Sequence, residues 1–383
     1  MIARTGDIAI SAEKVAHVNE GALVEAGKNG QTVAISGKEG VTLNSTVKSG
    51  NPVAGNAAAV AEGALPVYEV GGAVLLTSEN GSVVQEDKGV LTSASVTVTS
   101  GNAIVLENEQ SLFRTFTANG VERVKTDAAG NEIKDEDDNP VTETRIDGSV
   151  LVKAHAGSNL DASVTHTVYG NVALKNMDAG SLTVLSDVTA KEGKNGETGS
   201  IVFKQQGDIL VKGTLQADGY VTEEGYEETE QGIVGAGTIT NEKDIQAGKD
   251  VTLRTTSGDI HTLGTITAAE NVIAASTAST DGKIQISGDV FATNITVASL
   301  GASIITEKYM DASQDVTVKT LIGDIDLKGS VHAGQNIGIS SGINDLGGNN
   351  DASGNISITG SLSATNNLTV QTGYTGNNPN KGN

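Results

Sequence analysis

Apolar and polar residues alternate in short runs along most of the chain. Runs such as "DVTLRT" (from Asp250) and "DVTVKT" (from Asp315) place Val and Leu at every second position, which is the period that turns one face of a β-strand inward. Gly-Asp, Gly-Asn and Ala-Gly pairs separate the runs and supply turns. Helix signals are nearly absent, so the pattern predicts an all-β protein built from short strands.

The strands recur at a nearly constant interval. In the C-terminal half, three sets of equivalent positions advance together: an Asp or Asn before a first strand, an Ile in a second strand and an Ala ending a third. The sets are Asp250, Asn271, Asn294, Asp315, Asn336 and Asn367, then Ile260, Ile284, Ile304, Ile325 and Ile356, then Ala268, Ala292, Ala312, Ala333 and Ala364. Upstream, the run from Ala73 recurs 22 residues later from Ser95, and the run from Gly170 matches that from Gly199.

Three strands and three turns per roughly 21 residues describe one triangular coil. A single coil cannot bury its apolar face, whereas stacked coils form parallel sheets around one core. The sequence therefore predicts a parallel β-helix (β-solenoid), right-handed because parallel crossovers prefer that hand. We expect the Asp and Asn positions to stack at one corner and to bond backbone amides of the turns.

Departures from the interval divide the chain. Less regular coils are expected over 1–113, an inserted β-hairpin over 114–148, further coils over 149–216 and an acidic insertion with Tyr220 and Tyr226 over 217–232. Regular coils follow over 233–372, with an enlarged corner loop at 341–355, and residues 373–383 are expected to form a flexible tail. The start, "MIARTGDIAISAE", has no apolar signal-peptide core and runs directly into the pattern, so we interpret the chain as a fragment of a longer one.

The composition narrows the functional classes. A formal net charge of −22 argues against binding to nucleic acid or to an anionic membrane, since both need clustered Lys and Arg. No run approaches 18 apolar residues, so membrane insertion is not expected. The chain has no Cys, which excludes disulfides and suits export of an unfolded chain.

Two phrases, "IQAGKDVTLRTTSGDIHTLGTITAAENV" and "GDIDLKGSVHAGQNIGIS", resemble the repeats of filamentous-haemagglutinin-like exoproteins. That family comprises large adhesins exported by two-partner secretion, and autotransporter passengers use a similar repeat. The resemblance covers most of the chain and is best over 240–372. It implies a secreted or surface-attached bacterial adhesin shaft, and it carries over no binding residue.

Parallel β-helices also include polysaccharide lyases and glycoside hydrolases, which need two carboxylates on one face. Asp324 and Asp326 point the same way on one strand, and Asp259 is expected three coils away from Asp324. Carboxylates at turns are usually turn-formers, so we assign no catalytic and no cofactor-binding residue. A polysaccharide-active enzyme stays as the alternative class.

Calcium is the one ion that the loops suggest, because Asp, Asn and Gly can supply oxygen ligands. The best loops are Asp135–Pro140 and Asn344–Asn355, and neither matches a known calcium-loop pattern. The five histidines (His17, His155, His166, His261 and His332) show no paired spacing, so zinc is not expected. We assign no metal ligand.

The expected function is structural: a β-solenoid shaft that displays or contacts a host-cell or bacterial surface protein or glycan. Contacts are expected at the insertions Arg114–Gly148 and Tyr220–Gln231, which interrupt the coils without serving the core. End-to-end self-association into a filament is a further alternative, because end coils offer unpaired strand edges.

Overall fold

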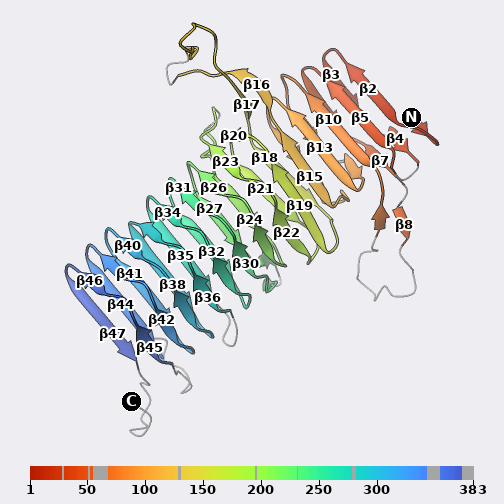
Figure 1. Ribbon diagram of the computed structural model, residues 1–383. Coiled ribbons are helices and arrows are strands. Elements are labelled where there is room, and N and C mark those ends of the chain that lie inside the picture. The colour runs from red at the N-terminus through yellow and green to blue at the C-terminus, as the bar shows by residue number, and fades with distance from the viewer. Residues whose placement is uncertain are drawn as a thin grey trace. The chain divides into compact units, whose positions relative to one another are not determined.

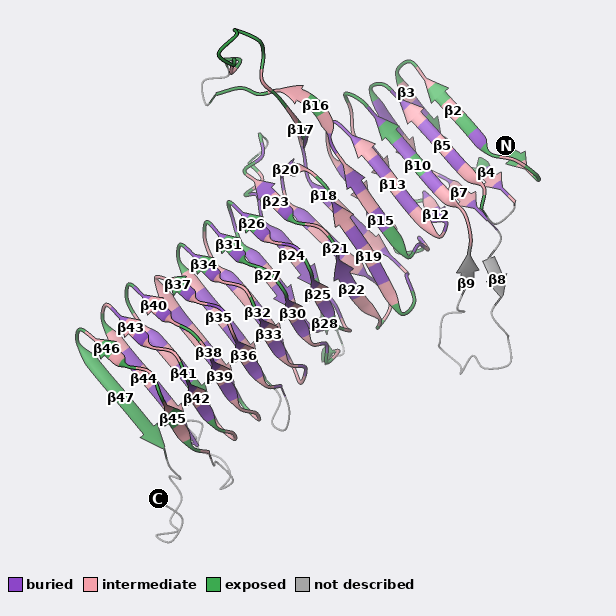
Figure 2. Cartoon of the chain, viewed as in Figure 1, coloured by how far each residue is buried: buried purple, intermediate pink, exposed green. Residues whose placement is uncertain are grey.

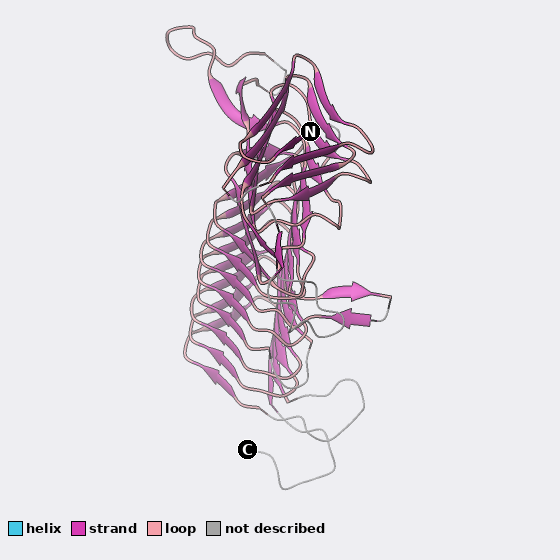
Figure 3. Ribbon diagram, turned by 90° about the vertical axis from the view of Figure 1, so that its right-hand side faces the viewer, coloured by secondary structure: helices cyan, strands magenta, loops and turns pink. Residues whose placement is uncertain are grey.

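The computed structural model describes residues 1–27, 30–50, 52–54, 68–127, 131–194, 196–230, 232–277, 282–342 and 354–372. Within these ranges the chain consists of strands and loops, with no helix (Figure 3). Accordingly, the described residues contain no helix that is long and apolar enough to span a membrane. The long sheets are built of parallel strands stacked in register, which confirms the predicted parallel β-helix (Figure 1).

Three long sheets and one short sheet line the coils. The first sheet contains β2 (Ile8–Ala12), β5 (Thr32–Gly37), β10 (Ala73–Ser78), β13 (Ser95–Ser100), β15 (Thr115–Asn119), β19 (Asn159–Val164), β22 (Ser181–Val184), β25 (Ile209–Val211), β30 (Ile239–Asn241), β33 (Ile260–Thr262), β36 (Ile284–Ile286), β39 (Ile304–Thr306), β42 (Ile325–Leu327) and β45 (Ile356–Ile358). The second sheet contains β3 (Val15–Val18), β6 (Gly40–Leu43), β11 (Val83–Gln85), β14 (Ile104–Leu106), β18 (Val150–Ala154), β21 (Val172–Asn176), β24 (Ile201–Lys204), β27 (Val221–Glu224), β32 (Val251–Thr255), β35 (Asn271–Ser276), β38 (Asn294–Ser299), β41 (Val316–Thr320), β44 (Asn336–Ser341) and β47 (Asn367–Thr372).

The remaining strands form the third and fourth sheets and two small hairpins. The third sheet contains β16 (Val121–Val124), β17 (Thr142–Ile146), β20 (Thr167–Tyr169), β23 (Val188–Lys191), β26 (Leu215–Ala217), β31 (Ile245–Ala247), β34 (Ile266–Ala268), β37 (Val290–Ala292), β40 (Met310–Ala312), β43 (Val331–Ala333) and β46 (Leu362–Ala364). The fourth contains β1 (Ile2–Ala3), β4 (Leu23–Ala26), β7 (Thr46–Ser49) and β12 (Val90–Thr92). The hairpins are β8 (Pro52–Ala54) with β9 (Tyr68–Val70), and β28 (Glu227–Thr229) with β29 (Gly232–Val234).

The chain divides into two compact units, one of residues 1–180 and 185–200, the other of 181–184 and 201–383. In the first unit the order of strands around a coil changes. Before β15, the chain passes from the first sheet to the second and then to the fourth; after β17, it passes from the first to the third and then to the second. The coils before β15 look less regular in sequence because their third strand lies in the fourth sheet, after the second. In the later coils the additional strand lies in the third sheet, between the first and the second.

The core of the second unit consists of aligned apolar columns. Ile260, Ile284, Ile304 and Ile325 are Cα partners in successive strands and are fully buried (Figure 2). Burying a side chain of this size stabilises the fold by roughly 1.5–3 kcal/mol. This column is the Ile set that the sequence predicted. In the first unit, Ala73 and Ser95 are partners as well, as their 22-residue offset indicated.

The predicted Asp and Asn positions form a hydrogen-bonded ladder at one corner. Asn271 Nδ2 donates to Asp250 Oδ1 at 2.7 Å, Asn294 Nδ2 to Asn271 Oδ1 at 3.0 Å and Asn336 Nδ2 to Asp315 Oδ1 at 2.8 Å. Each carboxylate is followed one coil further on by an Asn, whose amide supplies the donor that a carboxylate lacks. Like charges therefore never stand on neighbouring rungs of this ladder.

Replacing Asn271 by Asp would set a carboxylate directly beside Asp250 and remove the 2.7 Å bond. We expect the free energy of unfolding at pH 7 to fall by about 1–3 kcal/mol, because a donor is lost and like charges face each other. Urea titrations at pH 4 and pH 7 measure the effect, which should be smaller at pH 4. Asn366→Asp is the control, because Asn366 is next to Asn367 in the sequence but does not belong to the ladder. An equal fall in the free energy of unfolding in both variants would contradict this explanation.

A second column, inside the coils, was not predicted. Thr255, Ser276, Ser299, Thr320 and Ser341 are all buried at the ends of successive second-sheet strands. Their hydroxyls bond turn carbonyls, as Thr255 Oγ1 does to Gly258 O at 2.6 Å and Ser341 Oγ to Gly323 O at 2.8 Å. These bonds satisfy corner carbonyls that would otherwise be buried without a partner.

Both predicted insertions are narrower than the sequence indicated. Within 114–148, the strand Thr115–Asn119 belongs to the first sheet and pairs in parallel with β13 and β19, so the hairpin starts only at Val121. Within 217–232, the strand Val221–Glu224 is a regular rung of the second sheet, and the protruding pair is β28 with β29. Apolar and polar residues alternate both in the coil strands and in the insertions, so the sequence does not show where a rung ends and an insertion begins. The tail 373–383 and most of the loop at 341–355 lie outside the described residues.

Candidate functional site: the anchored hairpin

The hairpin β16–β17 leaves the first unit as an antiparallel pair (Figure 1). Beyond the strands, Lys125 N donates to Val141 O at 2.8 Å, and two smaller antiparallel pairs follow, Thr126 with Glu132 and Lys134 with Pro140. Gly120 starts the hairpin, and a Cβ there would lie 2.6 Å from backbone atoms of Arg145. Only glycine allows the two arms to approach this closely.

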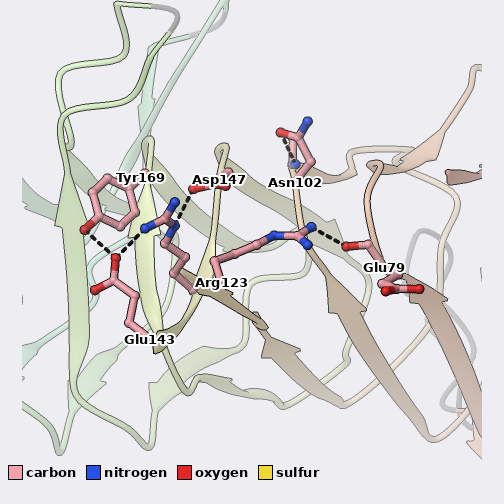
Figure 4. A network of polar contacts seen from close by, with 8 residues as sticks. Glu79, Asn102, Arg123, Glu143, Asp147 and Tyr169 are labelled. Carbon is pink, nitrogen blue, oxygen red and sulfur yellow. Dashed lines mark hydrogen bonds and ion pairs between the residues drawn. The ribbon is translucent and has the colours of Figure 1, made fainter. Parts of the chain in front are cut away.

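Arg145 on β17 is the centre of a polar network at the base of the hairpin, and Figure 4 labels its partners Glu143, Asp147 and Tyr169. Its Nη1 lies 2.6 Å from Glu143 Oε1 and its Nε 2.8 Å from Asp147 Oδ1. The guanidinium stands over the Tyr169 ring at 5.2 Å, and the Tyr169 hydroxyl donates to Glu143 Oε1 at 3.1 Å. Arg145 is only 8% exposed, so a forked, stacked guanidinium fixes β17 against β20.

The network changes the pKa values of Glu143 and Tyr169. Burial opposes ionisation of Glu143, but the hydrogen bonds from Arg145 and Tyr169 outweigh it and lower the pKa of Glu143. Burial and the neighbouring Glu143 carboxylate raise the pKa of the Tyr169 hydroxyl. Glu143 is therefore a carboxylate and Tyr169 a neutral donor at neutral pH, which is the state the geometry requires.

A second arginine ties the other arm to earlier coils. The Arg123 guanidinium donates through Nη1 to Asn80 Oδ1 at 3.2 Å and through Nη2 to the Glu79 carbonyl (Figure 4). A Cβ at Gly101 would lie 2.1 Å from Arg123 Nη2, so this glycine leaves room for the guanidinium. Both arms of the hairpin are thus held at the base by arginine.

The outer part of the hairpin is acidic, and its carboxylates serve the turn. Asp135 Oδ1 accepts bonds from the backbone N–H groups of Asn139 and Asp137, each at 2.9 Å, and these bonds lower its pKa. Lys134 Nζ pairs with Asp138 Oδ1 at 2.9 Å. Asp135–Pro140 was one predicted calcium loop, and no cluster of three acidic or histidine ligands occurs among the described residues. Most of the other loop, Asn344–Asn355, lies outside them.

The carboxylates considered for catalysis sit at corners and bond backbone amides. Asp259 Oδ1 accepts from Lys283 N and Asp324 Oδ1 from Asn355 N, each at 2.7 Å. Asp259 and Asp324 are three coils apart, roughly 14 Å at the usual strand spacing, which exceeds the separation that glycoside hydrolysis uses. Asp326 is the middle, outward residue of β42, and Asp324 directly precedes that strand. The structure does not bring the three together.

The histidines do have partners that the sequence search missed. His155 Nδ1 lies 2.8 Å from Asp178 Oδ1, and His332 Nδ1 lies 2.7 Å from Asp311 Oδ1. These residues are separated by 23 and 21 positions, about one coil, so a search at the repeat interval would have found them. A search for short metal-ligand spacings could not.

Comparisons with known protein families, with curated proteins and with solved structures give no match. The functional argument therefore depends on the geometry alone.

Proposed function

We propose that the chain is a shaft segment of a secreted or surface-attached bacterial adhesin and that the hairpin β16–β17 is a contact element. One observation carries the proposal: Arg145 and Arg123 anchor the base of an element whose outer part lies away from the coils (Figure 1). An anchored base keeps the outer residues in a defined position at a small entropic cost on binding.

The coils suit the role of a shaft. In the second unit the strands of successive coils pair in parallel, and from Asp250 onward the Asp and Asn ladder adds hydrogen bonds at one corner. Repeat proteins of this kind are stabilised by neighbouring repeats and tolerate insertions at their turns. Stacked coils can therefore set a distance and still carry contact elements.

A partner for the hairpin is expected to carry positive charge or hydrogen-bond donors. The outer hairpin exposes Glu132, Glu136 and Asp137, within a chain of net charge −22. A surface protein with a basic patch, or a glycan with amino groups, fits this chemistry. Secretion and attachment to a bacterial surface belong to the same proposal.

Trimming the hairpin tests the proposal. Val124 and Thr142 are Cα partners, so replacing 125–141 by Asn-Gly closes the arms with a two-residue turn and keeps Arg123 and Arg145. Beads coated with the purified chain are applied to human cell layers and to a panel of matrix proteins. We expect the trimmed variant to lose at least about tenfold of the adhesion, as removal of a contact centre does, with a Tm within about 4 °C of the parent.

The matched control trims the other hairpin of the same unit. Ala54 and Tyr68 are partners on β8 and β9, so replacing 55–67 by Asn-Gly shortens the chain there by a similar number of residues. This control should adhere like the parent. Absence of adhesion by the parent, or equal adhesion by both trimmed variants, would contradict the proposal.

A further inference from the structure

The outer face of the third sheet in the second unit presents one central side chain per coil. Because each strand has three residues with the outer two facing inward, only the middle residue points to solvent. The register aligns these middle residues in single file: Gln216, Gln246, Thr267, Phe291, Asp311, His332 and Ser363. The face is thus a narrow line of side chains, one rung apart.

Phe291 stands out in this line. Phe113, Phe116 and Phe203, the other three phenylalanines of the chain, are fully buried, whereas Phe291 is 37% exposed. The Tyr309 ring, from the corner before β40, meets it edge-on with centroids 6.3 Å apart and an angle of 65°. An exposed aromatic pair on an otherwise polar line calls for a functional reason, because the core does not use it.

Two polar groups extend the aromatic pair along the line. His332 Nδ1 is 2.7 Å from Asp311 Oδ1, and Tyr309 directly precedes the strand that carries Asp311. Partial desolvation and the Asp311 carboxylate raise the pKa of Tyr309, so its hydroxyl stays protonated. The His332–Asp311 contact and the Phe291–Tyr309 ring contact place an acid, an imidazole and two aromatic rings along three neighbouring coils.

We propose that Phe291, Tyr309, Asp311 and His332 bind a neutral saccharide chain that lies along the line. Aromatic rings offer an apolar face to the C–H groups of a pyranose ring, while carboxylate and imidazole exchange hydrogen bonds with its hydroxyls. Neighbouring rungs are roughly 4.8 Å apart, close to the length of one pyranose unit. A linear saccharide can therefore advance about one sugar per coil.

The same geometry disfavours other partners. A stable protein interface needs about 800 Å² on each side, and a line one side chain wide does not offer that area by itself. The net charge of −22 repels sulfated or sialylated chains and nucleic acids. A neutral saccharide needs neither a broad surface nor positive charge.

This inference goes beyond the proposed adhesin function, since it places a ligand on the coils and not on the hairpin. The variant trimmed at 125–141 keeps all four residues of the line. Failure of the hairpin proposal and failure of the saccharide proposal can therefore be told apart with the same set of proteins.

Isothermal titration of the full chain with cellohexaose, chitohexaose and maltohexaose tests the proposal. We expect at least one of the three to bind, and Phe291→Thr or Tyr309→Thr to weaken binding by at least about tenfold, as loss of an aromatic anchor does. Thr267 is the equivalent of Phe291 one coil earlier, and Thr265 is the equivalent of Tyr309 two coils earlier, so the coil should tolerate both replacements. Gln216→Thr, on the same line three coils before Phe291, is the control and should bind like the parent.

Asp311→Asn keeps the side-chain shape and provides a second test if an aromatic variant unfolds. We expect it to weaken binding as well, because a charged acceptor for hydroxyl groups is lost. Absence of binding to all three saccharides, or equal affinity of the parent and the folded variants, would overturn the proposal. Binding of a matrix protein in place of a saccharide, abolished by Phe291→Thr, would overturn it too.

Discussion

Replacing Glu223 by glutamine is expected to raise the free energy of unfolding at neutral pH by roughly 3 kcal/mol, because burial holds the pKa of the Glu223 carboxyl group far above its ordinary value. Glu223 on β27 is fully buried between Phe203 and Leu253, its Cα partners on β24 and β32. Its Oε2 accepts a bond from Asn241 Nδ2 at 3.1 Å, while Glu223 Oε1 and Asn241 Oδ1 are buried and have no hydrogen-bond partner among the described residues. Burial raises the pKa of Glu223 to about 8.

The sign of the pH dependence follows from that pKa. Between its ordinary value of 4.5 and about 8, the folded chain holds a proton on Glu223 that the unfolded chain has lost. The contribution of Glu223 to the free energy of unfolding is therefore fully present below pH 4.5 and is lost as the pH rises through 8. The protonated acid has a hydroxyl that can serve Asn241 Oδ1, and the glutamine amide supplies the same donor at every pH.

Urea titrations at pH 5, 7 and 9 measure the effect. We expect the advantage of Glu223→Gln over the parent to grow from pH 5 to pH 8 and then to level off. The neighbouring Glu224, whose Oε2 lies 2.8 Å from the largely exposed Lys204 Nζ, provides the control: Glu224→Gln should change stability by less than about 1 kcal/mol. A constant difference between parent and Glu223→Gln from pH 5 to pH 9 would mean that Glu223 is ionised in the fold.

Replacing Arg145 by methionine is expected to lower the free energy of unfolding by about 2–4 kcal/mol, since removal of one member of a buried ion pair leaves its partners unpaired. Glu143 and Asp147 would keep partly buried carboxylates without the guanidinium, and Tyr169 would lose its stacked cation. Thermal unfolding followed by circular dichroism measures the loss. Lys134→Met is the control on the same hairpin, where an exposed ion pair with Asp138 contributes less than about 0.5 kcal/mol.

The double variant Glu143→Gln/Arg145→Met distinguishes two causes of the loss of stability. One is the missing attraction of the guanidinium, and the other is the Glu143 carboxylate left without a cation. We expect the double variant to recover part of the stability, because the neutral amide costs less to bury than an unpaired carboxylate. Equal loss in Arg145→Met and Lys134→Met would show that the network does not anchor the hairpin. The contact role of the hairpin would then lose its main support.

The regular part of the fold could be predicted because each coil repeats the same chemistry. The column from Ile260 to Ile325 and the ladder from Asp250 to Asn367 follow directly from residues at one interval. The change in strand order near β15 could not be predicted, since each strand there alternates like any other and nothing local shows which corner it follows. Thr115–Asn119 was assigned to an insertion for this reason.

The candidate sites show a different limit. Glu223 lies in "VTEEGYEETE", a charged run that suggests exposure, yet the register gives it the inward position of Phe203 and Leu253. Aligning that run with "IVFK" and "VTLR" would have placed the carboxyl inside. The Arg145 network joins residues of the returning arm with Tyr169 on the next coil, so it depends on how the hairpin returns to the third sheet. The Ala set that ends the third strands already aligns Phe291, Asp311 and His332, each one residue before its Ala, but the sequence does not show that the ring of Tyr309 meets Phe291.

All of these proposals depend on one register, and engineered cysteines test it most directly because the chain has no native Cys. Thr296 and Thr317 are Cα partners on β38 and β41, and neighbouring strands lie roughly 4.8 Å apart, within the range that a disulfide bridges. We expect Thr296→Cys/Thr317→Cys to oxidise within one chain, as read by mass spectrometry, and Thr296→Cys/Lys319→Cys, shifted by two residues to roughly 8 Å, to stay reduced. Efficient oxidation of the shifted pair in place of the aligned pair would contradict the register and the columns built on it.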